Sequence, residues 1–129
     1  MRIRIYYEDT DAGGIVYHSN YIKFCERARS EFCFTNGVKF SKDRHFVVTK
    51  ILANYIKPAV LGDMIDVKTK VNKIGKASMI LDQEIFRVAS LETQCFELLF
   101  TAQITVAFMC HGRVGKMDDE LASLFASKL

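Results

Sequence analysis

The sequence predicts an α+β domain in which one long helix packs against an antiparallel sheet. Residues 20–36 repeat apolar side chains at the spacing of an amphipathic helix. Several later segments have the length and apolar content of strands, and short turn sequences separate them. Because turns of hairpin length join antiparallel neighbours, these strands are expected to form a meander that packs on the helix. The chain has 129 residues, of which 50% are hydrophobic, so residues 1–129 are predicted to form a single domain.

The N-terminal part contains the first predicted strand, residues 2–7, followed by the long helix. The helix is expected to run from about Asn20 to Asn36, with Ser19 or Asn20 as its cap and Gly37 as its stop. Its predicted apolar face consists of Tyr21, Phe24, Cys25, Ala28 and Phe32. Charged residues at helical spacing on the remaining surface are expected to form weak surface ion pairs; they are Glu26, Arg27, Arg29 and Glu31.

The remaining strands follow in sequence order. An apolar strand covers residues 46–56, Pro58 ends it, and Gly62 with Asp63 makes the turn. The next strand alternates cleanly, with Ile65, Val67, Thr69 and Val71 on one side and Asp66, Lys68, Lys70 and Asn72 on the other. A hairpin at Gly75 leads to a strand over residues 77–88, and a second turn leads to a long strand over residues 93–109. Residues 111–116 are predicted to be a loop, and a short closing helix is expected from about Asp118.

Composition excludes several classes of protein. The formal net charge is +3 without a dense basic patch, which argues against a nucleic-acid-binding protein. The sequence contains no apolar run long enough to cross a bilayer, and its first residues lack the apolar block of a secretory signal. The four cysteines show no metal-ligand spacing, so no zinc site is predicted. The cysteines are predicted to be free thiols in a reducing compartment, and we therefore expect a cytoplasmic protein.

The loop before the long helix carries the strongest functional signal. Asp9 and Asp11 flank Thr10, and Gly13 and Gly14 follow them. A carboxylate is thereby held just before a helix N-terminus, where unpaired backbone N–H groups converge and the helix dipole is positive. Such an end stabilises a carbonyl oxygen that gains negative charge during a reaction.

The same stretch carries a family motif. It reads Tyr7, Asp9, Asp11, Gly14, Ile15, Val16, Tyr17, His18, Asn20 and Tyr21. Along the helix an E-x-A-R-x-E pattern follows, and residues 58–63 have the form P-A-x-x-G-D. Together these motifs resemble the signature of the hot-dog-fold acyl-CoA thioesterases, of the 4-hydroxybenzoyl-CoA thioesterase and YbgC-type group.

The resemblance implies a fold and an activity. The fold would be a hot-dog, a five-stranded antiparallel sheet wrapped around one long helix, with a short C-terminal helix added. Two subunits would pair edge to edge, with residues 46–56 contributing, so that each active site lies at the subunit interface. A homodimer is the expected minimum, and a homotetramer is common in the family. The enzyme would hydrolyse acyl-CoA to a free acid and CoA without a metal or organic cofactor.

The resemblance also implies catalytic residues. Asp11 corresponds to the family's catalytic carboxylate and would act as nucleophile or as general base; both routes stay open. The backbone N–H of His18 would polarise the thioester carbonyl, and its side chain is a candidate for orienting water or substrate. Tyr7 is a candidate for hydrogen bonding near Asp11. The alternative, non-catalytic roles are those of a turn aspartate for Asp11, a solvent-exposed histidine for His18 and a core tyrosine for Tyr7.

Other residues are predicted to bind substrate. Gly14, Val16 and Tyr17 belong to the motif beside the catalytic acid. Candidates for contacting the phosphates of CoA lie on turns and near strand ends; they are Lys57, Lys73, Lys76, Ser78 and Arg113. Their alternative role is to keep a sheet edge solvated, which lysine commonly does.

Two other functions compete with the thioesterase hypothesis. One is a hydratase or dehydratase on the same fold. The other is a non-catalytic acyl-binding module in phospholipid or envelope metabolism, with an acyl-carrier protein as a partner. The sequence contains no G-x-S-x-G element, which argues against a serine hydrolase.

Overall fold

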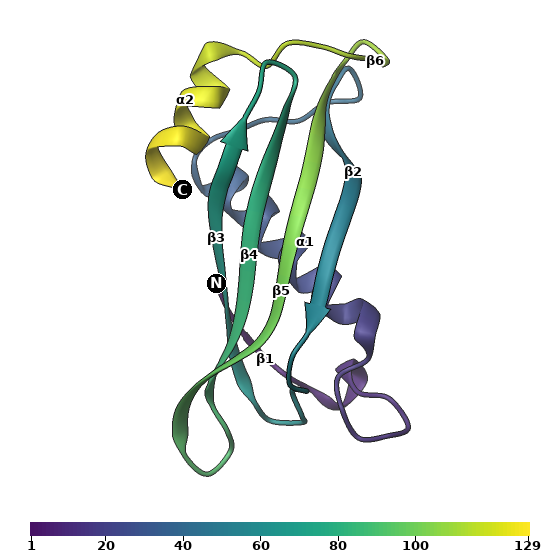
Figure 1. Cartoon of the computed structure of the whole chain (residues 1–129), viewed down its shortest axis with the longest axis vertical. Coiled ribbons are helices and arrows are strands. Elements are labelled where there is room, and N and C mark those ends of the chain that lie inside the picture. Colours follow the sequence, from purple (N-terminus) through teal and green to yellow (C-terminus); the bar gives the residue numbers. More distant parts are fainter.

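The computed structural model describes residues 1–129, which form one antiparallel sheet with a long helix on one face (Figure 1). The elements are β1 (Arg2–Arg4), the 3-10 turn η1 (Tyr7–Asp9), α1 (His18–Thr35), β2 (Arg44–Tyr55), β3 (Met64–Ile74), β4 (Ser78–Ala89), β5 (Gln94–Cys110), β6 (Arg113–Val114) and α2 (Asp119–Lys128). The strand order is β1-β3-β4-β5-β2, and the two-residue β6 is a sixth strand that pairs with β5. The predicted meander is therefore correct only for β3, β4 and β5, because β2 pairs with β5 and not with β3, its neighbour in sequence. The predicted hot-dog architecture is confirmed, including the short C-terminal helix.

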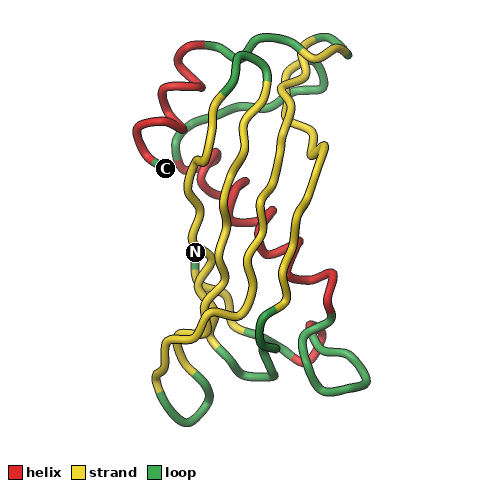
Figure 2. The backbone as a smooth tube through the Cα atoms, in the orientation of Figure 1, coloured by secondary structure: helices red, strands yellow, loops and turns green.

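Helix α1 crosses one face of the sheet diagonally, and α2 lies at one end of the sheet beside β3 (Figure 1 and Figure 2). The side of α1 that faces the sheet buries Tyr21, Phe24, Cys25, Ala28 and Cys33, close to the predicted apolar face. Phe32 is only partly buried. The strands contribute alternate residues to the same core, among them Ile65, Leu81, Phe100 and Ile104. This packing fixes the position of the helix start relative to the sheet.

Strand β2 forms one edge of the sheet. It pairs with β5 from Arg44 opposite Cys110 to Tyr55 opposite Phe100, with a bulge between Val48 and Lys50. Its other side has no strand beside it within the chain. Four of its large hydrophobic side chains are exposed, those of Val47, Val48, Leu52 and Tyr55. A long apolar edge of this kind is a template for pairing with another strand.

Three local predictions are wrong. The first strand ends at Arg4 because residues 7–9 turn into a 3-10 helix. Helix α1 begins two residues earlier than expected and has no side-chain cap; Asn20 instead donates from Nδ2 to the Asp9 carbonyl at 2.9 Å.

The third difference concerns residues 111–116, predicted as a loop. They contain β6, because His111 and Gly112 both adopt positive φ, at 52° and 81°, and so form a tight hairpin turn. No helix of the structure is both long and apolar enough to span a membrane.

Candidate active site

The loop between β1 and α1 is tied to the helix start by Asp9. Its carboxylate Oδ2 accepts a hydrogen bond from the backbone N–H of Tyr6 at 2.9 Å. Its carbonyl oxygen accepts two more, from the backbone N–H of Tyr17 and from Asn20 Nδ2, each at 2.9 Å. These contacts give Asp9 a structural role and place the loop against the first turn of α1.

Asp11 lies at the solvent-exposed tip of this loop. Its Oδ1 accepts a hydrogen bond from the backbone N–H of Gly13 at 2.8 Å. A Cβ at Gly13 would lie only 3.2 Å from that same oxygen, so this residue must be small. Gly14 has a φ of +80°, a conformation that glycine adopts without strain. The loop therefore holds one carboxylate oxygen of Asp11 and leaves the other without a partner in the chain.

The start of α1 offers unpaired donors. Tyr17 precedes the helix and its side chain makes no capping bond. The backbone N–H groups of His18 and Ser19 donate to no other group in the chain, whereas that of Asn20 bonds the Tyr17 carbonyl at 2.9 Å. Unpaired amides at the positive end of a helix can hold an oxyanion. No hydrogen bond within one chain joins these amides to the Asp11 carboxylate.

His18 is fixed by two neighbours. Its carbonyl oxygen accepts a hydrogen bond from the Tyr55 hydroxyl at 2.8 Å, and its ring lies 4.5 Å from the Tyr17 ring, centroid to centroid. Tyr55, at the end of β2, is a site residue that sequence reasoning missed. Burial is the main cause that raises its pKa, so its hydroxyl stays protonated and donates. Its ring packs at 5.5 Å against that of Tyr21, which links β2 to the helix start.

The segment before β3, residues 57–63, supports the loop from the other side. The Val16 N–H donates to the Ala59 carbonyl at 2.9 Å, and the Tyr21 hydroxyl accepts from the Ala59 N–H at 3.0 Å. Asp63 is 1% exposed, and its Oδ2 accepts from the Val60 N–H at 2.9 Å and from Arg87 Nη1 at 2.6 Å. The segment is thus held by a buried ion pair.

Glu97 extends this ion pair to the surface. Its carboxylate bonds Arg87 Nε at 3.2 Å and Lys57 Nζ at 3.3 Å. The hydrogen bond from Arg87 is the main cause that lowers the pKa of Glu97, and Lys57 adds to it. Lys57, a predicted phosphate contact, therefore already has a carboxylate partner.

The other predicted residues are spread over the chain. Tyr7 is 82% exposed, so it is not a core tyrosine, and no hydrogen bond joins it to Asp11. Val16 is 2% exposed and its side chain belongs to the core, while Tyr17 is half exposed. Four candidate phosphate contacts lie in or next to the β3–β4 turn and on β6, at the opposite end of the sheet from residues 6–17 (Figure 1); they are Lys73, Lys76, Ser78 and Arg113. Within one chain, these four side chains therefore lie far from Asp11 and the start of α1.

The prediction of surface ion pairs along α1 is wrong. None of the four charged residues forms an ion pair with another. Glu26 accepts a hydrogen bond from Ser30 Oγ at 2.6 Å, and Arg29 reaches across to the sheet, where its Nη1 donates to Gln83 Oε1 at 2.8 Å. Arg29 lies on the flank of the helix nearest the sheet, which explains why it finds this partner.

Comparison with known proteins decides the family. The model of the thioesterase superfamily matches residues 13–94. The chain belongs to this superfamily. The match begins in the acid loop and includes α1, β2, β3 and β4. The family predicted from the motifs at residues 7–31 and 58–63 is therefore confirmed, as is the enzyme class of thioester hydrolase.

Individual relatives agree with this family. The chain is 42% identical over 112 residues to the acyl-CoA thioesterase YbgC of Helicobacter pylori, covering 84% of each chain. It is 40% identical over 87 residues to the acyl-CoA thioester hydrolase YbgC of Escherichia coli, covering 64% of this chain and 65% of the relative. Among solved structures, a probable thioesterase from Bartonella henselae superposes with a TM-score of 0.77 at 31% identity, covering 92% and 96% of the two chains. A 1,4-dihydroxy-2-naphthoyl-CoA thioesterase from Synechocystis has a TM-score of 0.86 at 17% identity, covering 99% and 95%, and supports the fold alone.

Proposed function

We propose that this chain hydrolyses acyl-CoA thioesters, with Asp11 as the reacting carboxylate and the start of α1 as the oxyanion site. The observation that supports this most is the pair of unpaired backbone N–H groups at His18 and Ser19, directly after the loop that carries Asp11. The proposal is further supported by the similarity of the chain to YbgC acyl-CoA thioesterases, which match 84% and 64% of its length in two relatives.

The chemistry requires one acid and one set of donors. Water, or the Asp11 carboxylate itself, adds to the carbonyl carbon, and the oxygen takes up negative charge that the helix amides stabilise. The C–S bond then breaks, and the thiolate of CoA leaves. In the general-base route Asp11 accepts the proton of the attacking water. In the nucleophilic route Asp11 forms a mixed anhydride, which a water molecule then cleaves to free acid and carboxylate.

The active enzyme is proposed to be at least a homodimer. Strand β2 offers an unpaired edge with exposed apolar residues, and its last residue, Tyr55, bonds the start of α1. Antiparallel pairing of two β2 strands would continue the sheet from one subunit to the next and enclose each helix start at the interface. That assembly would supply from a second copy the walls that one chain lacks around Asp11.

Replacement of Asp11 by Asn tests the proposal. Loss of a general acid–base or nucleophilic group should lower kcat by about 10²–10⁴-fold, measured as CoA thiol release from a panel of acyl-CoAs. The matched control is Glu8→Gln, which neutralises another exposed acid of the same loop and should retain activity. Full activity in Asp11→Asn would refute the proposed role. Consumption of an enoyl-CoA without thiol release would instead favour a hydratase.

A further inference from the structure

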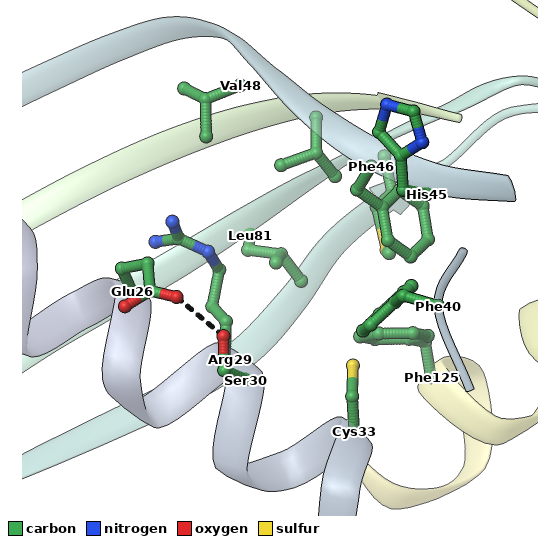
Figure 3. A pocket seen from close by; sticks show the side chains of 12 residues that line it. Glu26, Arg29, Ser30, Cys33, Phe40, His45, Phe46, Val48, Leu81 and Phe125 are labelled. Carbon is green, nitrogen blue, oxygen red and sulfur yellow. Dashed lines mark hydrogen bonds between the residues drawn. The ribbon is translucent and has the colours of Figure 1, made fainter. Parts of the chain in front are cut away.

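A second candidate site lies on the C-terminal half of α1, away from the helix start. A cavity of about 350 Å³ opens between α1, α2 and the sheet, where β2, β4 and β5 contribute to its lining, and its volume is within the range of small-molecule sites (Figure 3). Eight of its twelve lining residues are hydrophobic; they include Cys33, Phe40, Phe46, Leu81 and Phe125. Arg29, at its wall, is eleven residues after His18, about 16 Å along the helix axis.

Arg29 brings a positive charge into this apolar cavity. Its side chain extends from α1 into the space between the helix and the sheet (Figure 3). No carboxylate lies within ion-pair distance of its guanidinium. Burial is the main cause that lowers its pKa. Glu26, the acid on the same wall, accepts a hydrogen bond from Ser30 and leaves Arg29 without a counter-ion.

The guanidinium is held in place by a fully buried amide. Gln83 Nε2 donates to the Cys25 carbonyl at 3.0 Å and to Thr69 Oγ1 at 2.9 Å, so its Oε1 must accept, and it accepts from Arg29 Nη1. This is the one hydrogen bond to oxygen that Arg29 makes through its side chain. The remaining N–H donors of the guanidinium are therefore available to a ligand in the cavity.

We propose that this cavity binds an organic carboxylate, with Arg29 pairing its charge and the aromatic wall packing its apolar body. A partly buried cation without a counter-ion has an unfavourable desolvation free energy. A bound carboxylate would offset that free energy by pairing with the charge, and its two oxygens match the planar geometry of the guanidinium. Phe40, Phe46 and Phe125 form a connected set, with Phe46 and Phe125 5.9 Å apart and Phe40 and Phe46 6.0 Å apart between ring centroids. This wall suits an alkyl or aryl body.

The carboxylate has two candidate sources. One is a free carboxylic acid. The other is a carboxylate at the far end of an acyl group, a source that rests on the proposed function. In the antiparallel pairing proposed for β2, the start of that strand lies beside the end of the partner's β2, near the partner's helix start. The cavity of one subunit would then receive the acyl group held at the thioester site of the other.

A tryptophan reporter tests binding directly, because the chain contains no tryptophan. Phe40→Trp places one indole at the cavity wall, and titration with octanoate should change its fluorescence to saturation. Octanol, which has the same chain length but no charge, should bind at least tenfold more weakly. Phe96→Trp, an exposed position on β5 outside the cavity, is the reporter control and should not respond.

Two arginine variants of α1 test whether Arg29 is the cation that binds the carboxylate. In the Phe40→Trp background, Arg29→Gln should weaken octanoate binding at least tenfold and leave octanol unchanged. Arg27→Gln removes the same charge from an exposed position of α1 and should have no effect. If Arg29→Gln fails to fold, the proposal is tested by the affinities of octanoate and octanol for the Phe40→Trp protein that retains Arg29. Equal binding of the two ligands, or no effect of a folded Arg29→Gln, would overturn the proposal.

A hydrolysis assay distinguishes the two sources. If the acyl group supplies the carboxylate, kcat/KM for adipoyl-CoA should exceed that for hexanoyl-CoA, and Arg29→Gln should remove the preference. If hexanoyl-CoA is preferred while octanoate still binds, a free acid is the ligand. The titration requires no turnover, so octanoate binding would stand even if Asp11→Asn were fully active and the proposed mechanism failed.

Discussion

Removal of Arg87 should destabilise the protein more than removal of any exposed charge. Asp63 is 1% exposed, and Arg87 is its only cationic partner, at 2.6 Å. Arg87→Met leaves a buried carboxylate without a counter-ion, which typically costs about 3–5 kcal/mol. For a domain of this size, a loss of about 4 kcal/mol corresponds to a fall of roughly 15 °C in Tm.

The assay is urea unfolding followed by circular dichroism, at one fixed protein concentration because an oligomer's apparent stability depends on concentration. The control is Lys57→Met, which removes the exposed partner of Glu97 and should cost far less.

An equal loss of stability in Arg87→Met and Lys57→Met would refute the proposed role of the buried ion pair between Arg87 and Asp63.

Three further predictions follow from the structure. Tyr55→Phe should lower kcat about tenfold with little change in Tm, since it removes only the hydrogen bond that positions the first carbonyl of α1; an unchanged kcat would contradict that role. Leu52→Lys should shift the protein toward monomer in light scattering after gel filtration, whereas Phe34→Lys, at an exposed apolar position of α1, should not; a dimer retained in Leu52→Lys would exclude the β2 edge as the interface. Burial raises the pKa of Cys25 to about 12, so this thiol should resist alkylation at pH 8 in the native protein and react after unfolding; rapid native labelling would show that the core around Cys25 opens.

Periodicity predicted the helix and the strands because those patterns are local. Residues 65, 67, 69 and 71 share one face of β3, as their alternation indicated, and the apolar stripe of α1 lies on the sheet. The start of α1 was misplaced because the Asn20 side chain, expected to cap the helix, donates to the Asp9 carbonyl instead, a contact that helical spacing does not reveal.

The less predictable parts of the site depend on contacts between distant segments. Tyr55 contacts His18 across 37 positions of sequence, and Arg29 contacts Gln83 across 54. From helical spacing alone, Arg29 is predicted to be solvent-exposed and to pair with charged residues of the same helix. The spacing does not show which strand residue lies opposite Arg29. The predicted phosphate contacts on the β3–β4 turn lie far from the acid loop within one chain, and only an assembly could bring such ends together.

A crystal structure of Asp11→Asn with an intact acyl-CoA would test the proposed roles of Asp11 and of the helix amides most directly. The thioester carbonyl oxygen should lie about 3 Å from the unpaired backbone N–H groups at the start of α1, with the side chain at position 11 beside the carbonyl carbon. A bound thioester whose carbonyl faces other donors, with position 11 turned into solvent in every subunit, would contradict these roles.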